Sequence, residues 1–139
     1  MGTEATATAA NPPAEHWKAE PDAHDYPAAQ AYLSLLLLPE RAAEVVDRLR
    51  DAPLQHFKAK DLVRASRLDL LPESNEHVAA DLKKVKQGRL LSPVLLVRGQ
   101  LAHDVPLTVA DGYHRICASY WLDENADIPC QLVDARPEA

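Results

Sequence analysis

The stretch from residue 107 to residue 122 changes from the residue pattern of a β-strand to that of a helix. Residues 107–110 form a β-prone run, Asp111 and Gly112 interrupt it, and residues 113–122 resume with the spacing of a helix. A glycine between strand and helix lets the backbone approach a ligand closely, and the free N–H groups of the new helix attract anions. Arg115 adds a charged fork suited to phosphate or carboxylate. The stretch therefore predicts a strand–turn–helix unit with an anion site, most simply for the phosphates of a nucleotide.

Further strands and helices flank this unit. A helix is expected between Asn75, which can cap it, and Gly88, which is suited to end it. Residues 94–97 are a continuous apolar run of strand length, typical of a strand covered on both faces. Residues 128–133 predict a last strand. Alternating strands and helices indicate a small α/β (α+β) fold in which helices pack on a mixed β-sheet.

A helical segment precedes this core. Pro27 and Pro39 sit where first helical turns would begin, which predicts helices near 27–37 and 39–51, with Asp25 as a cap for the first. A third helix is expected near 58–67. The leucines of residues 33–38 are apolar nearly all round a helix, so some must contact a neighbouring helix or a second copy of the chain. We therefore expect a homodimer through the first two helices.

The composition indicates one domain with short tails. At 139 residues, 47% of them apolar, the chain can bury one core but hardly two. We expect a disordered tail at 1–24, the helical segment at 25–67, the α/β domain at 68–134 and a second tail at 135–139. The tail lacks the basic and apolar regions of a signal peptide, and Pro39 stops the leucine run far short of a membrane span. A soluble, cytoplasmic protein without membrane contact is expected, with Cys117 and Cys130 as buried structural thiols.

The charge of the chain bears on its partners. A net charge of −6 argues against a protein that coats DNA. Between Lys58 and Arg98, however, nine Lys or Arg residues face five Asp or Glu residues. A solvated helical face accounts for most of these charges, and contact with a nucleic acid stays open as an alternative.

The residues 68–133 resemble the ParB/sulfiredoxin superfamily. Residues 70–72 resemble its opening strand and Pro loop, residues 75–88 its first helix, residues 91–97 its Pro-Val strand and residues 128–133 its final strand. The turn formed by Asp111, Gly112, Tyr113, His114 and Arg115 is similar to the nucleotide-phosphate site of that superfamily. The resemblance implies that these five residues bind a nucleotide such as ATP, ADP or CTP, with or without Mg²⁺.

Departures from the family narrow the expected activity. Sulfiredoxins have a reactive cysteine where this chain has Tyr113, so that reductase activity is not expected. Chromosome-partition ParB proteins match only Gly112 and Arg115, and they continue into a helix-turn-helix domain that this sequence does not show. Free-serine kinases of the superfamily carry Asp-Gly-His-Thr-Arg, which matches three of the five turn positions. Their essential carboxylate lies in the loop that Glu73 and Glu76 occupy here.

Each candidate residue also has an ordinary structural interpretation. Gly112 could serve only the turn, Arg115 could pair with Asp111 or Asp123, and His114 could be a surface histidine rather than an acid or base. Glu73 and Glu76 could simply favour the dipole of a helix N-terminus instead of acting as general bases. The leading prediction is a stand-alone ParB-like protein that binds a nucleotide or a phosphorylated small molecule. The alternatives are a small-molecule (free-serine-type) kinase or phosphohydrolase and a nucleic-acid-binding or nuclease-type module, so enzymatic activity stays an open question.

Overall fold

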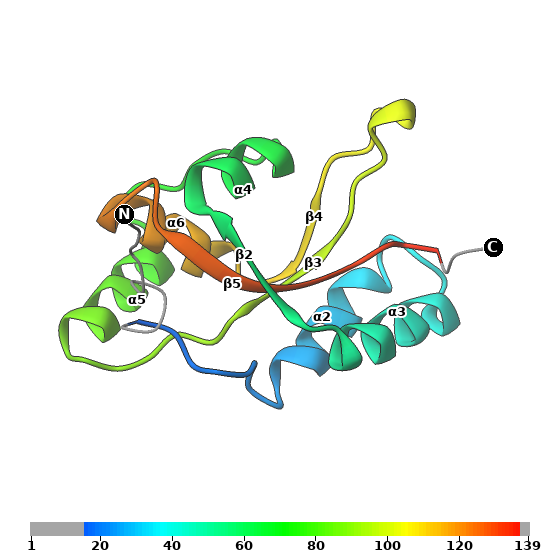
Figure 1. The fold of residues 1–139 in the computed structure, drawn as a ribbon, viewed down its shortest axis with the longest axis horizontal. Coiled ribbons are helices and arrows are strands. Elements are labelled where there is room, and N and C mark those ends of the chain that lie inside the picture. The colour runs from blue at the N-terminus through cyan, green and yellow to red at the C-terminus, as the bar shows by residue number, and fades with distance from the viewer. Residues whose placement is uncertain (1–15, 137–139) are drawn as a thin grey trace, which may run out of the picture.

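A four-stranded mixed β-sheet forms the centre of the fold (Figure 1), and the computed structural model describes residues 16–136. The strands β2 (Leu54–Lys58), β5 (Asp127–Val133), β3 (Val94–Val97) and β4 (Thr108–Asp111) lie side by side in that order. β5 runs parallel to β3, whereas the outer pairs β2–β5 and β3–β4 are antiparallel. The protein therefore has an α+β fold with a mixed sheet, which confirms the predicted fold class.

Helices cover both faces of this sheet. α2 (Asp25–Leu33) and α3 (Pro39–Asp51) pack against Leu95 and Val97, whereas α4 (Ala59–Ser66) and α6 (Tyr113–Leu122) pack against Val94 and Leu96. α5 (Glu76–Lys86) packs against α6, and the short 3-10 helix η1 (Leu101–His103) lies at the tip of the β3–β4 hairpin. All four residues of β3 are buried, which confirms that this strand is covered on both faces. Within residues 16–136, no helix has the length and apolar character needed to cross a membrane.

The local sequence signals explain where two helices begin and one ends. The Asn75 side-chain oxygen accepts hydrogen bonds from the N–H groups of His77 and Val78, at 2.9 and 3.1 Å, and so caps α5. Gly88 follows this helix with a φ of 77°, the left-handed conformation that suits a glycine after a helix. Pro39 is the first residue of α3, as its missing N–H favours. These three predictions are confirmed.

The first helix ends four residues before its predicted end at position 37. The N–H of Ser34 donates to the Gln30 carbonyl at 2.9 Å, and the chain then turns before Pro39. Leu38 has a ψ of 145°, because the ring of the following proline disfavours helical geometry. Most of the leucine run is therefore a turn between two helices rather than a helix.

The sheet has one strand that the sequence did not indicate, and it lacks one that was expected. β2 pairs with β5 at the edge of the sheet, so residues 25–67 supply a strand as well as helices. Residues 70–72, expected as the opening strand and Pro loop, have no regular secondary structure and lie beside α6. Trp121 donates from Nε1 to the Leu71 carbonyl at 2.8 Å, and its side chain is 40% exposed.

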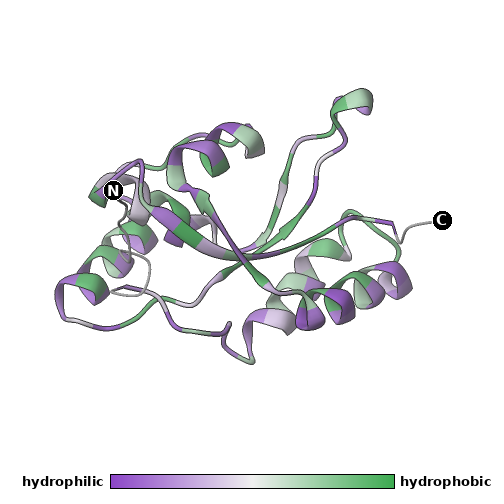
Figure 2. Ribbon diagram, viewed as in Figure 1, coloured by the Kyte–Doolittle hydropathy of each residue, from purple (hydrophilic) through white to green (hydrophobic). Residues whose placement is uncertain are grey.

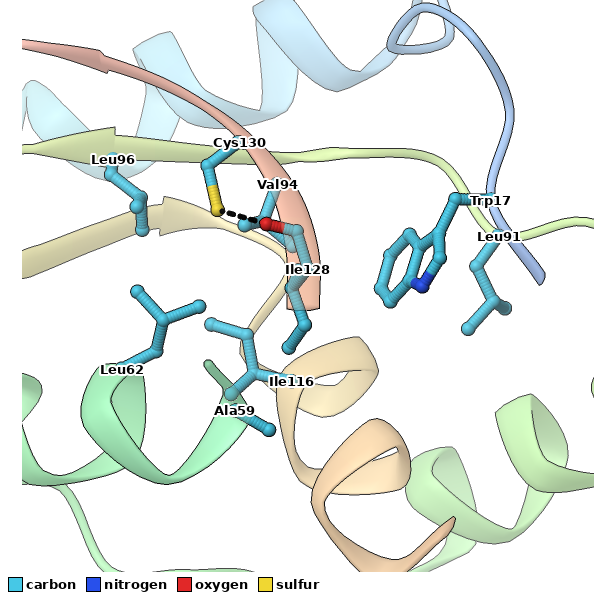
Figure 3. Packing of buried hydrophobic residues seen from close by; sticks show 9 residues of the cluster. All are labelled: Trp17, Ala59, Leu62, Leu91, Val94, Leu96, Ile116, Ile128 and Cys130. Carbon is cyan, nitrogen blue, oxygen red and sulfur yellow. Dashed lines mark hydrogen bonds between the residues drawn. The ribbon is translucent and has the colours of Figure 1, made fainter. Parts of the chain in front are cut away.

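The fold includes residues that we expected in the N-terminal tail. Trp17 is only 5% exposed and lies beside Leu91 in the core (Figure 3). The backbone on either side of Trp17 bonds to Leu91, through Leu91 N–H to His16 at 2.7 Å and Lys18 N–H to Leu91 at 2.8 Å. Residues 16–24 are thus part of the fold and not of a disordered tail, whereas residues 1–15 lie outside the described part. The polar composition of this segment predicted a tail, but the large apolar surface that Trp17 buries holds the segment against the core.

Both cysteines are free and buried, as predicted. Cys130 lies on β5 and its thiol donates to the Ile128 carbonyl at 3.2 Å (Figure 3). Cys117 lies on the core side of α6. Burial raises the pKa of both thiols, so neither is activated as a nucleophile.

Candidate functional site

Gly112 forms the turn between β4 and α6. Its φ is 110°, a positive value that residues with a side chain rarely adopt. A Cβ at this position would lie 2.5 Å from Cγ1 of Val94 and 2.8 Å from Nη2 of Arg115. The structure therefore requires a glycine because the turn packs directly on β3, and the close neighbour is a core side chain.

The N-terminus of α6 has free backbone donors. The first hydrogen bond within this helix runs from the Ile116 N–H to the Gly112 carbonyl at 3.1 Å. The preceding N–H groups, on Tyr113, His114 and Arg115, therefore have no acceptor within the helix. No side chain caps this end, in contrast to α5, where Asn75 does. The positive end of the α6 dipole and these donors make this end of the helix suitable for an anion.

Two histidines meet beside this helix end. The ring centroids of His77, in the first turn of α5, and His114, in the first turn of α6, are 4.6 Å apart, and both residues are exposed. Burial of part of the ring lowers the pKa of His114 below its ordinary value of 6.5, and the nearby His77 lowers it further. His114 is therefore mostly neutral at pH 7 and gains a charge as the pH falls. The sequence singled out His114 but not His77.

Asp81 is a buried carboxylate on the same side of α5 as His77. The two residues are four positions apart, which places them on one face of the helix. Burial raises the pKa of Asp81, and the cations Lys84 and Arg115 oppose this effect. The Lys84 ammonium lies 3.8 Å from the Asp81 carboxylate. Asp81 was not predicted as a site residue, although an acidic residue between the apolar core positions Val78 and Leu82 is unusual enough to have indicated one.

We expect Asp81→Asn to raise the free energy of unfolding at pH 7. A carboxyl whose pKa is raised in the folded state contributes stability below its ordinary pKa, and that contribution is lost as the pH rises through the raised value. The amide of the variant has no charge to desolvate, so the variant avoids this penalty. Below about pH 3.8, the ordinary pKa of an aspartate, the wild-type carboxyl is also uncharged, and the gain in the free energy of unfolding should vanish. Urea unfolding at several pH values measures this difference. Asp47→Asn, in an ion pair whose aspartate is 75% exposed, is the control and should change little. Lower stability of Asp81→Asn at pH 7 would show instead that attraction to Lys84 outweighs desolvation.

Arg115 is held inside the molecule. Its Nη2 donates to the Asp111 carboxylate and to the Pro93 carbonyl, both at 3.2 Å, and lies 3.8 Å from the Asp25 carboxylate. Its side chain is 17% exposed. This is the ion pair with Asp111 that sequence analysis left open, with a second carboxylate that it did not foresee. The guanidinium therefore fixes the turn to β4 and to the segment before β3, and does not project into solvent toward a ligand.

Asp25 belongs to this ion cluster and does not cap α2 as predicted. It is 2% exposed and accepts hydrogen bonds from the Ser92 hydroxyl and, at 3.1 Å, from the Asp22 N–H. Burial raises the pKa of Asp111, Arg115 counteracts that effect, and the adjacent Asp25 raises the pKa again. Two acidic groups thus share one guanidinium. Because 66 residues or more separate Asp25 from its partners Ser92, Asp111 and Arg115, no local pattern could have predicted the cluster.

Tyr113 anchors the loop that precedes α5. Its hydroxyl donates to the Asp69 carbonyl at 2.7 Å, and burial raises its pKa well above the ordinary range. With the bond from Trp121 to Leu71, this contact holds residues 68–71 along α6. The Tyr113 side chain is therefore engaged within the chain, whereas its backbone N–H lies at the helix end.

The two glutamates of the loop before α5 lie in different surroundings. Glu73 borders a shallow hollow with Leu122, which is at the opposite end of α6 from the turn. Glu76 is the first residue of α5 and the neighbour of His77 in the chain. Of the two predicted bases, Glu76 is therefore the one whose neighbour in the chain, His77, packs against His114 of the turn.

One group of residues has the composition of a cation site. Ligand atoms of Asp22, His24 and Asp25 all lie within 4.8 Å of one another. The guanidinium of Arg115 already lies 3.8 Å from Asp25, and the Lys18 ammonium lies 2.7 Å from Asp22. Because the side chains of this chain already supply positive charge to the group, we assign it no metal.

Comparison with known proteins identified no relative. No family model matches the chain, and neither a curated protein nor a solved structure matches it significantly. The resemblance to the ParB/sulfiredoxin superfamily therefore stays a prediction from the residues of the turn and the order of the elements.

Proposed function

We propose that this chain binds a phosphate-bearing small molecule, of which a nucleotide is the best candidate, at the N-terminus of α6. The observation that carries the proposal is an uncapped helix end beside two imidazoles whose centroids are 4.6 Å apart. Backbone N–H groups, a helix dipole and histidines that charge on protonation all favour a phosphate. The resemblance of residues 111–115 to the nucleotide-phosphate turn of the ParB/sulfiredoxin superfamily supports the same assignment.

The turn residues divide into those that contact the phosphate and those that position the helix. The N–H groups of residues 113–115 and the imidazoles of His77 and His114 are the contacts. The side chains of Asp111, Tyr113 and Arg115 hold the helix end in place through their bonds inside the molecule.

A small molecule is a better candidate than a nucleic acid. Several basic residues of the segment between Lys58 and Arg98 are engaged within the chain: Arg64 with Asp61, Arg67 with Asp104 and Arg98 with Asp134. These pairs reduce the local positive charge that a phosphate backbone would need. The net charge of −6 also disfavours binding to the phosphate backbone of a nucleic acid.

Calorimetric titration with ATP, ADP and CTP, with and without Mg²⁺, tests the proposal. We expect the double variant His77→Gln with His114→Gln to bind the preferred nucleotide at least about 10-fold more weakly, because two charge-assisted contacts are lost. His56→Gln, on the exposed edge of β2, is the matched control and should bind normally. The proposal fails if the wild-type protein binds none of the three nucleotides or if the double variant binds as well as the wild type.

The pH dependence gives a second readout of the same site. Because the pKa of His114 is lowered in the free protein, affinity should increase as the pH falls from about 8 to about 6 and the imidazole gains its proton. Below about pH 6 the phosphate itself begins to lose charge, so the range above that value is the informative one. The double variant should show little change over this range. An equally steep profile in both proteins would exclude the histidines as the contacts.

The same samples separate a binding protein from a phosphotransferase. If nucleotide is consumed in the presence of an acceptor such as free serine, a carboxylate must accept the hydroxyl proton. Glu76→Gln should then abolish turnover and leave the affinity unchanged, whereas Glu73→Gln, at the other end of α6, should do neither. Binding without consumption identifies the chain as a binding protein.

A further inference from the structure

The connection between α2 and α3 exposes several large apolar side chains. Leu35, Leu36 and Leu38 are 81%, 57% and 69% exposed, and Tyr32 beside them is 44% exposed. No residue from 32 to 38 carries a charge. Contiguous apolar surface of this kind on a folded chain typically marks a contact with another molecule.

The base of the β3–β4 hairpin continues this surface. Leu36 borders a hollow of about 420 Å³ that is also lined by Leu68, Val97 and Val105. Leu68 and Val105 are 49% and 43% exposed. Figure 2 shows green, hydrophobic segments both in the α2–α3 connection and in the hairpin. We call these six exposed residues the leucine surface: Tyr32, Leu35, Leu36, Leu38, Leu68 and Val105.

The leucine surface contains both protruding side chains and a hollow. Leu35 and Leu38 are the more exposed leucines of the α2–α3 connection and do not line the hollow, whereas Leu36 does. A contact related by a two-fold axis brings the same patch of both partners together. Such a contact lets the protruding leucines of each copy meet the hollow of the other. A surface with both features is suited to its own copy.

The charges around the leucine surface also favour a second copy. Arg98 pairs with Asp134 at 2.7 Å and Arg67 pairs with Asp104 at 2.8 Å, so the charged groups at its rim are balanced. Two copies of a chain with a net charge of −6 repel each other unless they meet at a neutral face. A strongly charged partner, in contrast, would meet no net charge of opposite sign at the leucine surface.

We propose that the leucine surface is the contact between two copies of this chain in a symmetric dimer. The contact leaves the proposed phosphate site open. Asp25 begins α2 and contacts Arg115, whereas the leucine surface follows the other end of that helix, about 13 Å away along its axis. Each dimer therefore has two accessible helix ends, and the dimer does not depend on the proposed function.

Sedimentation equilibrium of the full chain from about 1 to 100 μM tests the dimer, since these concentrations cover the usual range for such contacts. We expect a dimer for the wild type, and a dissociation constant at least about 100-fold higher for Leu35→Glu with Leu38→Glu, because two apolar contacts become charged. These leucines are exposed in the single chain, so the variant should retain the wild-type circular dichroism spectrum. Leu90→Glu with Leu122→Glu, 44% and 48% exposed and outside the leucine surface, is the matched control and should dimerise normally.

Three results overturn the proposal. The wild type could sediment as a monomer at all concentrations. The Leu35 and Leu38 variant could dimerise like the wild type, which would place the contact elsewhere. The control variant could lose the dimer to the same extent, which would show that any added acid disrupts association. Because none of these readouts involves a nucleotide, failure here is distinct from failure of the phosphate site.

Discussion

Arg115→Ala is expected to destabilise the fold by about 3 kcal/mol, the lower end of the cost of breaking a buried ion pair. The guanidinium is 17% exposed and serves Asp111, Asp25 and the Pro93 carbonyl together. Its removal leaves two adjacent carboxylates without a cation, in surroundings that already raise the pKa of Asp111. Urea unfolding followed by circular dichroism measures the loss. An exposed phosphate-binding arginine would give no such loss, so this measurement separates the two roles of Arg115.

The loss should also depend on pH with a definite sign. A carboxyl with a raised pKa destabilises the fold in its charged form, and this penalty disappears when the pH falls below the ordinary value of 3.8. The difference between Arg115→Ala and the wild type should therefore shrink as the pH falls toward that value. Adding Asp111→Asn to Arg115→Ala should recover part of the loss at pH 7, because one uncompensated charge is removed.

Arg98→Ala is the matched control for Arg115→Ala. Arg98 also forms an ion pair, with Asp134 at 2.7 Å, but its side chain is 59% exposed. Water screens such a pair, so the change in the free energy of unfolding should be below about 1 kcal/mol. If Arg115→Ala costs no more than Arg98→Ala, the interior ion cluster does not stabilise the fold and our account of Arg115 is wrong.

The elements that could be predicted from the sequence are those with local physical causes. α5 has a capping Asn75 and a terminal Gly88, and β3 is a continuous apolar run, so both were found. β2 was missed because its five residues include Gln55, His56 and Lys58, and only pairing with β5, more than 60 residues later in the chain, makes them a strand. Tertiary partners of this kind leave no local signal.

The candidate site was predictable to a similar degree. The turn itself was found, because Gly112 between a β-prone run and a helical pattern has a local meaning. The role of Arg115 was not settled, because its partner Asp25 lies 90 residues earlier in the sequence. The approach of His77 to His114 depends on how α5 packs across α6, which neither helix alone determines.

Gly112→Ala is expected to destabilise the fold by about 2–5 kcal/mol. A side chain is disfavoured at a φ of 110°, which costs about 1–2 kcal/mol. The new Cβ would also lie 2.5 Å from Cγ1 of Val94, a fully buried side chain on β3. Overpacking of this kind costs about 1–3 kcal/mol more.

Gly88→Ala separates these two causes, because Gly88 has a φ of 77° and a Cβ added there would meet nothing within 4 Å. Gly88→Ala should therefore lower the free energy of unfolding only by the cost of a side chain at a positive φ. The difference between the two variants then measures the contact of the new Cβ with Val94 and Arg115. In a double-mutant cycle, Val94→Ala should reduce the cost of Gly112→Ala by about 1 kcal/mol or more, since the methyl group in contact is gone. Equal costs for the two glycine variants, with no coupling to Val94, would mean that the turn does not press on β3. The rigid placement of α6, on which the proposed phosphate site depends, would then lose its structural basis.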